Sequence, residues 1–320
     1  MKRYLKNIFY ISINIIIIYF FTLWIIENID IQKLKLAFLS VPIITVFIVF
    51  IVNFLTLFFY ANRLMSILDK SFFTSFSLIN LGYGFNAILP FRMGEIVKIL
   101  YAKKIYKIPS SQLIVSIFIE KILDISFLGL LLSLFLVFSV QNYISVKMLF
   151  IIFILVIGVV VFIYIARKSI LKLQNSENIE GKIKIFLLSV YKYSKGHNIK
   201  KLILKSGLIW VANLIAIYIT FNTLLSVEFS FINAIGLLLV IVLSIAIPAT
   251  PAGVGLFEAG IVAYLVTILN VDSEVALMSA ILFHLTVTVP QFAIMIAILS
   301  FARYNQKVEL RRDNIEKFKI

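Results

Sequence analysis

The chain has 320 residues, of which 62% are hydrophobic and 14% are charged, and its mean hydropathy is +1.07. A soluble domain of average composition carries about 25% charged residues, so these values exclude an ordinary soluble protein and predict an integral membrane protein. The apolar runs are long and continuous, which favours helices over the short alternating strands of a membrane barrel. The absence of cysteine excludes disulfides, thiol catalysis and cysteine metal sites.

The net charge of +15 is compatible with nucleic-acid binding or with the basic cytoplasmic loops of a membrane protein. The topology described below places 25 of the 30 Lys and Arg residues on the inner side. We therefore expect no nucleic-acid partner. The sequence contains no phosphate-binding glycine loop, no dinucleotide fingerprint and no paired-histidine metal motif, so we expect no cofactor and no metal.

The first half of the chain, residues 1–166, is expected to contain four full transmembrane spans. These are Ile8–Ile26, Leu36–Tyr60, Ser111–Val140 and Met148–Ala166. The basic N-terminus favours an uncleaved first span with its amino end in the cytoplasm. We expect outer loops at Glu27–Lys35 and Gln141–Lys147 and a cytoplasmic segment at Ala61–Lys70.

A polar break interrupts this half at Pro90–Glu95, between the apolar runs Phe72–Leu89 and Ile96–Ile105. The second run is too short to span, since about 20 residues are needed. Both flanks are basic, so we expect a re-entrant hairpin that enters and leaves on the cytoplasmic side.

The second half, residues 206–302, follows a basic cytoplasmic loop at residues 167–205. Ile183, Phe186, Leu187 and Val190 recur at helical spacing in that loop and predict an amphipathic surface helix. Full spans are expected at Ser206–Leu225 and Val275–Ala302, and residues 303–320 form a cytoplasmic tail.

A second break, Pro248–Glu258, lies between the apolar runs Phe231–Ile247 and Ala259–Leu269. The chain enters this break from the outer side of the membrane, so the flanking segments run in the opposite directions to those around the first break. We therefore predict an all-α polytopic membrane protein: one membrane domain with about six full transmembrane helices and two re-entrant hairpins in an inverted repeat, with both termini inside. Inverted repeats with broken helices are a recurring plan of transporters.

Six charged side chains lie in apolar surroundings: Arg92, Glu95, Glu120, Lys121, Asp124 and Glu258. Each costs about 2.5–3.5 kcal/mol at the centre of a membrane helix. Glu120 and Asp124 share one helix face, and Lys121 points about 100° away. Two interpretations remain open: Arg92 and Lys121 pair with the carboxylates and lock the bundle, or the charged groups handle a substrate.

The breaks also supply backbone groups. Pro90, Pro248 and Pro251 are the structural breaks, and Gly94, Gly253 and Gly255 precede or open new half-helices. The N–H groups at a helix N-terminus attract anions such as phosphate, and an adjacent arginine suits a phosphodiester. His284 lies in the middle of a span, where a hydrogen-bonded core histidine is favoured over a proton relay.

Three stretches together resemble the lysylphosphatidylglycerol synthase transmembrane-region family, a flippase-like domain found alone or fused to an aminoacyl-lipid synthase. They are Asn86–Glu95, Glu120–Asp124 and Pro251–Glu258, and their order and spacing extend the resemblance over nearly the whole chain. The chain has Lys121 where this family often has arginine, and Ala252 where it often has a second glycine.

This resemblance implies movement of a lipid between leaflets and an integral protein of the plasma membrane of a prokaryote. It gives lipid-handling roles to Arg92, Glu95, Glu120, Asp124 and Glu258. It does not extend to the soluble synthase domain, so we expect no aminoacyl transfer by the chain itself.

Three functions follow as hypotheses. The first is translocation of a phospholipid, plain or aminoacylated, with a lipid-modifying enzyme as a possible partner. The second is ion-coupled transport of a small soluble substrate, which shares the same inverted repeat. The third is a membrane enzyme or auxiliary subunit of lipid modification related to phosphatidylglycerol lysyltransferase, with Glu120 and Asp124 as acid and base.

Overall fold

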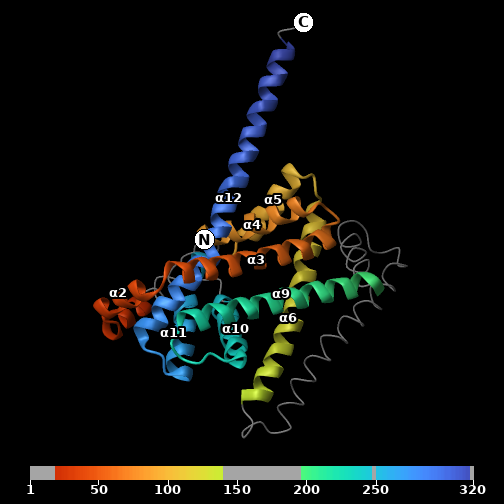
Figure 1. Cartoon of the computed structure of the whole chain (residues 1–320). Helices are drawn as coiled ribbons and strands as arrows, with labels where there is room; N and C mark the ends of the chain where they lie inside the picture. The colour runs from red at the N-terminus through yellow and green to blue at the C-terminus, as the bar shows by residue number, and fades with distance from the viewer. Residues whose placement is uncertain (1–18, 140–195, 247–249, 318–320) are drawn as a thin grey trace, which may run out of the picture.

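A computed structural model of the chain describes residues 19–139, 196–246 and 250–317, and describes residues 196–198 and 304–317 by their backbone only. All regular structure in these ranges is helical (Figure 1). Five helical segments are long and apolar enough to cross a membrane: Ile43–Leu68, Ser110–Ser139, Ile199–Leu224, Pro251–Leu269 and Ser273–Arg303. The prediction of a polytopic helical membrane protein is confirmed.

The helices that follow the helical stretch at residues 19–28 are α2 (Ile31–Ser40), α3 (Ile43–Leu68), α4 (Phe72–Ile88), α5 (Gly94–Ile105), α6 (Ser110–Ser139), α9 (Gly196–Leu224), α10 (Phe231–Ala246), the 3₁₀ turn η1 (Pro251–Gly253), α11 (Leu256–Leu269) and α12 (Ser273–Lys317). Most of the predicted first span, the outer loop Gln141–Lys147, the span Met148–Ala166, the amphipathic stretch and Pro248 lie outside the described residues.

The predicted outer loop Glu27–Lys35 is wrong, because most of it belongs to two helices. Only Ile29 and Asp30 separate residues 19–28 from α2. The Asp30 carboxylate accepts hydrogen bonds from the backbone N–H groups of Gln32 and Lys33, so it caps the new helix. The span predicted from Leu36 instead begins after Pro42, which lies at the N-cap of α3.

The predicted end of the span at Tyr60 is also wrong, because α3 continues to Leu68 and ends at Asp69 in the left-handed conformation. The cytoplasmic side of Ala61–Lys70 stays a prediction. Leu64, Ile67 and Leu68 are fully buried at helical spacing. Apolar residues at this spacing are typical of a helix with one buried face, so the helix continues through the polar residues between them.

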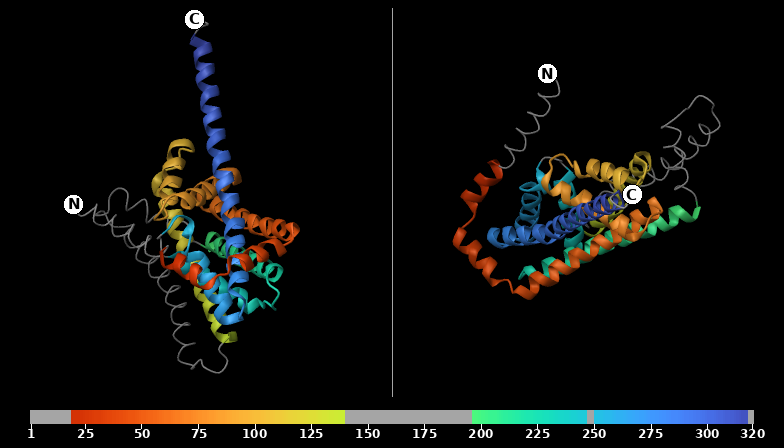
Figure 2. Two further views of the ribbon diagram at one scale, coloured as in Figure 1. Left: turned by 90° about the vertical axis from the view of Figure 1, so that its left-hand side faces the viewer. Right: turned by 90° about the horizontal axis from the view of Figure 1, so that it is seen from above.

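Three further boundaries differ from the prediction. Helix α9 begins at Gly196, ten residues before the predicted span, and α11 begins at Leu256 rather than Ala259. Helix α12 does not end at Ala302; its backbone is helical to Lys317 and projects well beyond the other described helices (Figures 1 and 2).

Helices α3 and α9 run side by side in opposite directions, as Figures 1 and 2 show. Polar contacts join them at intervals: Asn53 Nδ2 to Thr220 Oγ1 at 3.4 Å, Asn213 Nδ2 to Tyr60 Oη at 3.1 Å, and Arg63 Nη1 to Ser206 Oγ at 3.2 Å. The partner numbers fall on α9 as they rise on α3, which fixes the register of the pair. Interhelical hydrogen bonds are a regular means of joining helices in membranes.

Each break joins two helices that meet through small residues. In the first pair, a Cβ added to Gly94 at the start of α5 would lie 1.9 Å from the carbonyl oxygen of Gly82 in α4. In the second pair, a Cβ on Gly260 of α11 would lie 2.1 Å from Ser244 Oγ of α10. Close backbone approach at small residues is typical of membrane helix packing.

Replacing Gly94 by alanine should therefore destabilise the protein, because the new methyl group would meet rigid backbone at Gly82. Overpacking of this kind costs about 1–3 kcal/mol. Gly207→Ala in α9 is the matched control, since its Cβ would lie 3.4 Å from the Phe127 ring and alanine favours a helix. Thermal unfolding in detergent should show a lower midpoint for Gly94→Ala only; equal midpoints would contradict the close approach.

Candidate functional site

The two breaks contain the same local turn. In the first, Phe91 and Arg92 have φ values of 60° and 53°, and the Met93 N–H donates to the carbonyl of Pro90 at 3.4 Å. Two successive residues at positive φ inside such a bond are the signature of a type I′ turn.

In the second break, Ala252 and Gly253 have φ values of 54° and 82°, and the Val254 N–H donates to the carbonyl of Pro251 at 3.1 Å. Gly255 follows four residues after Pro251 and caps α11, just as Gly94 follows four residues after Pro90 and begins α5. The breaks therefore share the turn and the spacing from proline to glycine, but Gly255 has a φ of 88° before α11 whereas Gly94 is the first helical residue of α5.

The first N–H group of each new helix is already bonded within the chain. The Gly94 N–H donates to Asn86 Oδ1 at 2.8 Å, and the Gly255 N–H donates to Glu258 Oε2 at 2.8 Å. Asn86 and Glu258 thus occupy the positions that sequence reasoning offered to phosphate.

Arg92 connects the two breaks. Its own backbone is in the left-handed turn, and its guanidinium Nη2 donates to the carbonyl oxygen of Ile245 at 2.5 Å. Ile245 lies in the last turn of α10, where carbonyl groups lack helical partners and carry partial negative charge. Arg92 therefore caps the helix that leads into the second break.

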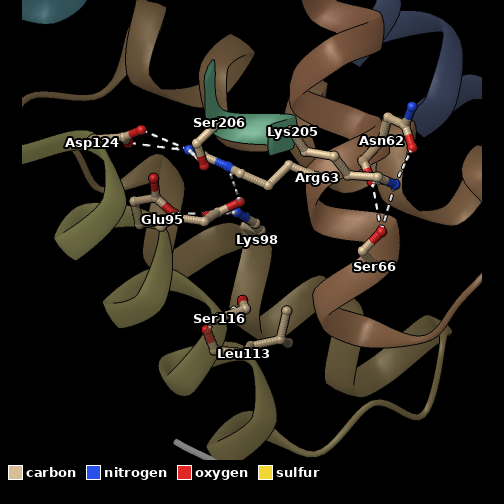
Figure 3. A network of polar contacts seen from close by, with 11 residues as sticks. Asn62, Arg63, Ser66, Glu95, Lys98, Leu113, Ser116, Asp124, Lys205 and Ser206 are labelled. Carbon is tan, nitrogen blue, oxygen red and sulfur yellow. Dashed lines mark hydrogen bonds and ion pairs between the residues drawn. The ribbon is translucent and has the colours of Figure 1, made fainter. Parts of the chain in front are cut away.

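Three of the predicted carboxylates meet in one buried cluster, the charged network, shown in Figure 3. It consists of Arg63 from α3, Glu95 and Lys98 from α5, and Glu120 and Asp124 from α6. Arg63 and Lys98 are each only 2% exposed. The network therefore joins three helices through two buried cations, while the Glu95 and Asp124 side chains stay 27% and 21% exposed.

Arg63 makes the shortest contacts of the network. Its Nη1 and Nη2 atoms donate to the two Asp124 oxygens at 2.6 and 3.3 Å, and its Nε lies 3.9 Å from Glu120 Oε1. A bidentate arginine–carboxylate pair is the strongest ion-pair geometry in proteins. Lys98 Nζ lies between Glu95 and Glu120, at 3.6 and 3.7 Å from their oxygens.

A third cation lies beside the network and outside it. Lys205 of α9 donates from Nζ to Asn62 Oδ1 at 2.5 Å and to Ser66 Oγ at 2.6 Å (Figure 3). These neutral acceptors lie on α3. Lys205 therefore extends the polar contacts between α3 and α9 without adding a carboxylate.

The network is loosely packed at its centre. A cavity of about 20 Å³ lies among its side chains, enough for about one water molecule. Arg63 Nε, Glu95 Oε2 and Glu120 Oε1 are buried there without a hydrogen-bond partner among the described residues. The carboxylates outnumber Arg63 and Lys98 by one.

The predicted pairing of the carboxylates with Arg92 and Lys121 is wrong. Arg92 binds the Ile245 carbonyl, and Lys121 is exposed at the wall of the small cavity. The true partners, Arg63 and Lys98, had been assigned to cytoplasmic segments. Buried Leu64 and Leu68, on one helical stripe with Ala61, were the signal that α3 continues and carries Arg63 inside.

A larger cavity lies between the second break and the end of α4. Its volume is about 580 Å³, within the range of about 300–1,000 Å³ usual for ligand sites. The lining is mainly apolar: Ala87, Ile88, Ala252, Val254, Ile281, Leu285, Val289 and Phe292, with Glu258, His284 and Thr288 as the polar members. It is the candidate binding site.

Glu258 and His284 form a pair on the wall of this cavity. His284 Nδ1 lies 2.5 Å from Glu258 Oε1, and the two residues are 6% and 8% exposed. The His284 ring stacks on Phe257 with centroids 4.3 Å apart. The interpretation of His284 as a hydrogen-bonded core residue is confirmed, and its partner is a predicted site residue.

The predicted site residues therefore lie in two separate places. Glu95, Glu120, Lys121 and Asp124 line the small cavity, whereas Glu258 lines the large one. Arg92 and Gly94 lie at the first break, and Gly253 and Gly255 at the second. No group of three or more side chains suited to a metal ion occurs in the described part of the chain.

Replacing Arg63 by methionine should strongly destabilise the fold, because three carboxylates would then face Lys98 alone. Breaking a buried ion pair in this way costs about 3–5 kcal/mol. Lys121→Met, which removes an exposed cation from the rim of the same cavity, should change stability by only about 0.5 kcal/mol. Unfolding midpoints in detergent measure both, and similar midpoints for the two variants would refute the structural role of Arg63.

Replacing Ala252 by glycine should stabilise the second break, because alanine at positive φ costs about 1–2 kcal/mol. The greater chain entropy of glycine offsets about 0.5–1 kcal/mol of that gain, so we expect a net gain of at most about 1.5 kcal/mol. Ala263→Gly, on the exposed face of α11, should lower the unfolding midpoint instead. A lower midpoint for Ala252→Gly would contradict the turn geometry.

Comparison with known proteins identifies the family. The family profile described as the lysylphosphatidylglycerol synthase TM region matches residues 11–294, nearly the whole chain. Searches among curated proteins and among solved structures gave no match. The match covers both breaks, the charged network and the large cavity, and agrees with the resemblance carried by the three stretches. The chain belongs to the lysylphosphatidylglycerol synthase TM-region family.

Proposed function

We propose that this protein moves a phospholipid, plain or aminoacylated, between the leaflets of its membrane. Membership of the family relates it to lipid modification or transport. The observation that carries the finer proposal is the large cavity, which combines an apolar wall with one buried carboxylate–histidine pair. A phospholipid has the same two parts, apolar chains and a charged headgroup.

The rim of the large cavity supports a lipid over a soluble substrate. Five of its apolar lining residues are 39–51% exposed: Ile88, Val254, Leu285, Val289 and Phe292. In a membrane helix, large exposed apolar side chains face the hydrocarbon. A cavity with such a rim opens sideways into lipid, so acyl chains can stay in the bilayer while the headgroup enters.

Two charged groups of this region suit different parts of the lipid headgroup. Glu258 offers a carboxylate to an ammonium group. Arg92 is exposed and bound to a backbone carbonyl, which a phosphate can replace as the stronger partner of a guanidinium. In this proposal the phosphate binds at Arg92, and the cationic part of the headgroup lies at Glu258.

The matching turns support a two-part mechanism of transport. Pro90–Met93 and Pro251–Val254 have the same turn geometry, as the predicted inverted repeat requires. Helices α4, α5 and α10 have 17, 12 and 16 residues, and at 1.5 Å per residue none reaches the roughly 30 Å of a bilayer core. Helix α11 has 14 residues, although with η1 it belongs to the segment Pro251–Leu269 that is long and apolar enough to cross. We propose that both pairs are re-entrant and that both termini lie in the cytoplasm of a prokaryotic cell.

The alternative of a membrane enzyme receives less support from the geometry. Asp124 is bound by both guanidinium nitrogens of Arg63, and Glu120 lies between Arg63 and Lys98. Carboxylates held by fixed cations are poor proton acceptors. We therefore propose that a separate lipid-modifying enzyme is the partner that supplies or consumes the transported lipid.

Glu258→Gln in reconstituted vesicles tests the site. Glutamine can still accept the Gly255 N–H and contact His284, so the fold should persist while the charge is lost. We expect transbilayer movement of a labelled aminoacyl phospholipid to slow by about tenfold or more, since hydrogen bonds to charged groups contribute about 1.5–3 kcal/mol. Protection of the label from a membrane-impermeant quencher measures the movement.

Glu228→Gln is the control, because it removes a carboxylate from the exposed loop between α9 and α10. Its rate should equal that of the unchanged protein. Unaltered movement in Glu258→Gln would remove Glu258 from the site. Absence of lipid movement in the unchanged protein, together with uptake of a water-soluble substrate, would favour the second type of transporter.

A further inference from the structure

The large cavity has a single titratable unit on its wall, the Glu258–His284 pair. Among its described lining residues, the others are apolar except Thr288, whose hydroxyl donates to the carbonyl of His284. Histidine is the side chain that ordinarily changes charge between pH 5 and 8. The pair is therefore a place where a proton can be held inside the cavity.

The groups that face the pair from neighbouring helices do not compensate its charge. Helix α4 contributes Ala87 and Ile88 to the wall, and η1 contributes Ala252. Two residues along α12 from His284, Thr286 contacts Asn53 of α3, which also contacts Thr220 of α9. These partners are neutral.

The remaining charged groups of this region are bound elsewhere. Arg92, in the turn after α4, donates to the Ile245 carbonyl, and Glu274 at the start of α12 accepts the Asp30 N–H. The charge of the cavity wall is consequently set by whether the Glu258–His284 pair holds a proton.

A proton on His284 and an ammonium group can each balance the negative charge of Glu258. With His284 protonated, the pair is neutral overall and Glu258 is balanced internally. With His284 neutral, Glu258 carries one uncompensated charge in a buried apolar site, where an unpaired ion costs several kcal/mol. An ammonium group entering the cavity supplies the missing partner, and the proton leaves His284 for water.

We propose that the Glu258–His284 pair binds either a proton or the ammonium group of the transported lipid, so that the lipid crosses in exchange for a proton. This inference rests on the proposed lipid translocation and adds its driving force. Its substrate class is a phospholipid whose headgroup carries a cationic amine. A headgroup without an amine cannot replace the proton.

The pair is also tied to the backbone that would move. The second oxygen of Glu258 accepts the Gly255 N–H at 2.8 Å, and Phe257 stacks on the His284 ring. Gly255, at φ 88°, is the hinge-like residue at the end of the second break. A change of partner at Glu258 therefore acts directly on the start of α11, as a two-state transport element requires.

The test uses vesicles containing the full chain, with a one-unit pH difference across the membrane. The probe is lysylphosphatidylglycerol carrying a fluorophore on one acyl chain, and a membrane-impermeant quencher reports its leaflet distribution. One-for-one exchange predicts a steady-state ratio between leaflets of about tenfold per pH unit. An ionophore that collapses the pH difference should return the ratio to one.

His284→Gln should still move the probe but leave it evenly distributed, because glutamine can donate to Glu258 without titrating. Glu228→Gln is the control and should follow the pH difference as the unchanged protein does. An even distribution in the unchanged protein would overturn the exchange while leaving lipid translocation intact. A pH response in His284→Gln would place the coupling elsewhere, and no movement of any kind would overturn the proposed function itself.

A second measurement needs no variant. Titration of the unchanged protein in detergent with lysylphosphatidylglycerol should release protons, up to one per lipid bound, seen as a dependence of the heat on the buffer. Phosphatidylglycerol, which lacks the amine, should release none. Equal proton release with both lipids, or none with either, would overturn the proposal even if His284→Gln failed to fold.

Discussion

Two helix breaks in an otherwise apolar chain create the constraint on which the rest of the structure depends. A break leaves backbone N–H and C=O groups without helical partners, and each unsatisfied group costs several kcal/mol in a membrane. Three side chains meet this cost: Asn86 binds Gly94, Glu258 binds Gly255, and Arg92 binds the carbonyl of Ile245. Arg92 comes from the first break and completes the helix before the second, so the second break depends on the first for its stability.

This constraint explains why the charged residues separate into two sets. The charged network joins α3, α5 and α6 through Arg63 and Lys98 and encloses room for about one water molecule. It fixes the helices around the first break. Near the second break the only described charges on the cavity wall are those of Glu258 and, when protonated, His284. One half of the protein is therefore held by buried ion pairs, whereas the other presents a carboxylate whose partner can change.

The sequence alone was sufficient for the helical membrane class, for both breaks and for the family, because composition, proline and glycine carry those signals locally. It failed where the partner is distant in sequence. Arg63 and Lys98 lie 57 and 22 residues from Glu120, and basic residues near span ends resemble cytoplasmic charge until α3 is seen to continue through Leu68. Similarly, nothing local predicts that Arg92 reaches Ile245, or that His284 rather than a cation meets Glu258. Loop boundaries failed for a different, local reason: Asp30 and Pro42 determine helix ends by capping and sterics, which a hydropathy profile does not include.

Glu258 links the fold of the second break to its chemistry, because its two oxygens have different partners. Oε2 accepts the Gly255 N–H and holds the start of α11, while Oε1 faces His284. Because one carboxylate makes both contacts, a change of partner at Oε1 also affects the bond between Oε2 and the backbone of Gly255. A transporter needs such a coupling between what its site binds and the conformation of its chain. The matching position in the first break is the apolar Val97, and the N-terminus of α5 is bound instead by Asn86 of α4, a neutral amide. The two breaks thus share their turn but differ in what satisfies it, and that difference assigns the titratable step to the second break.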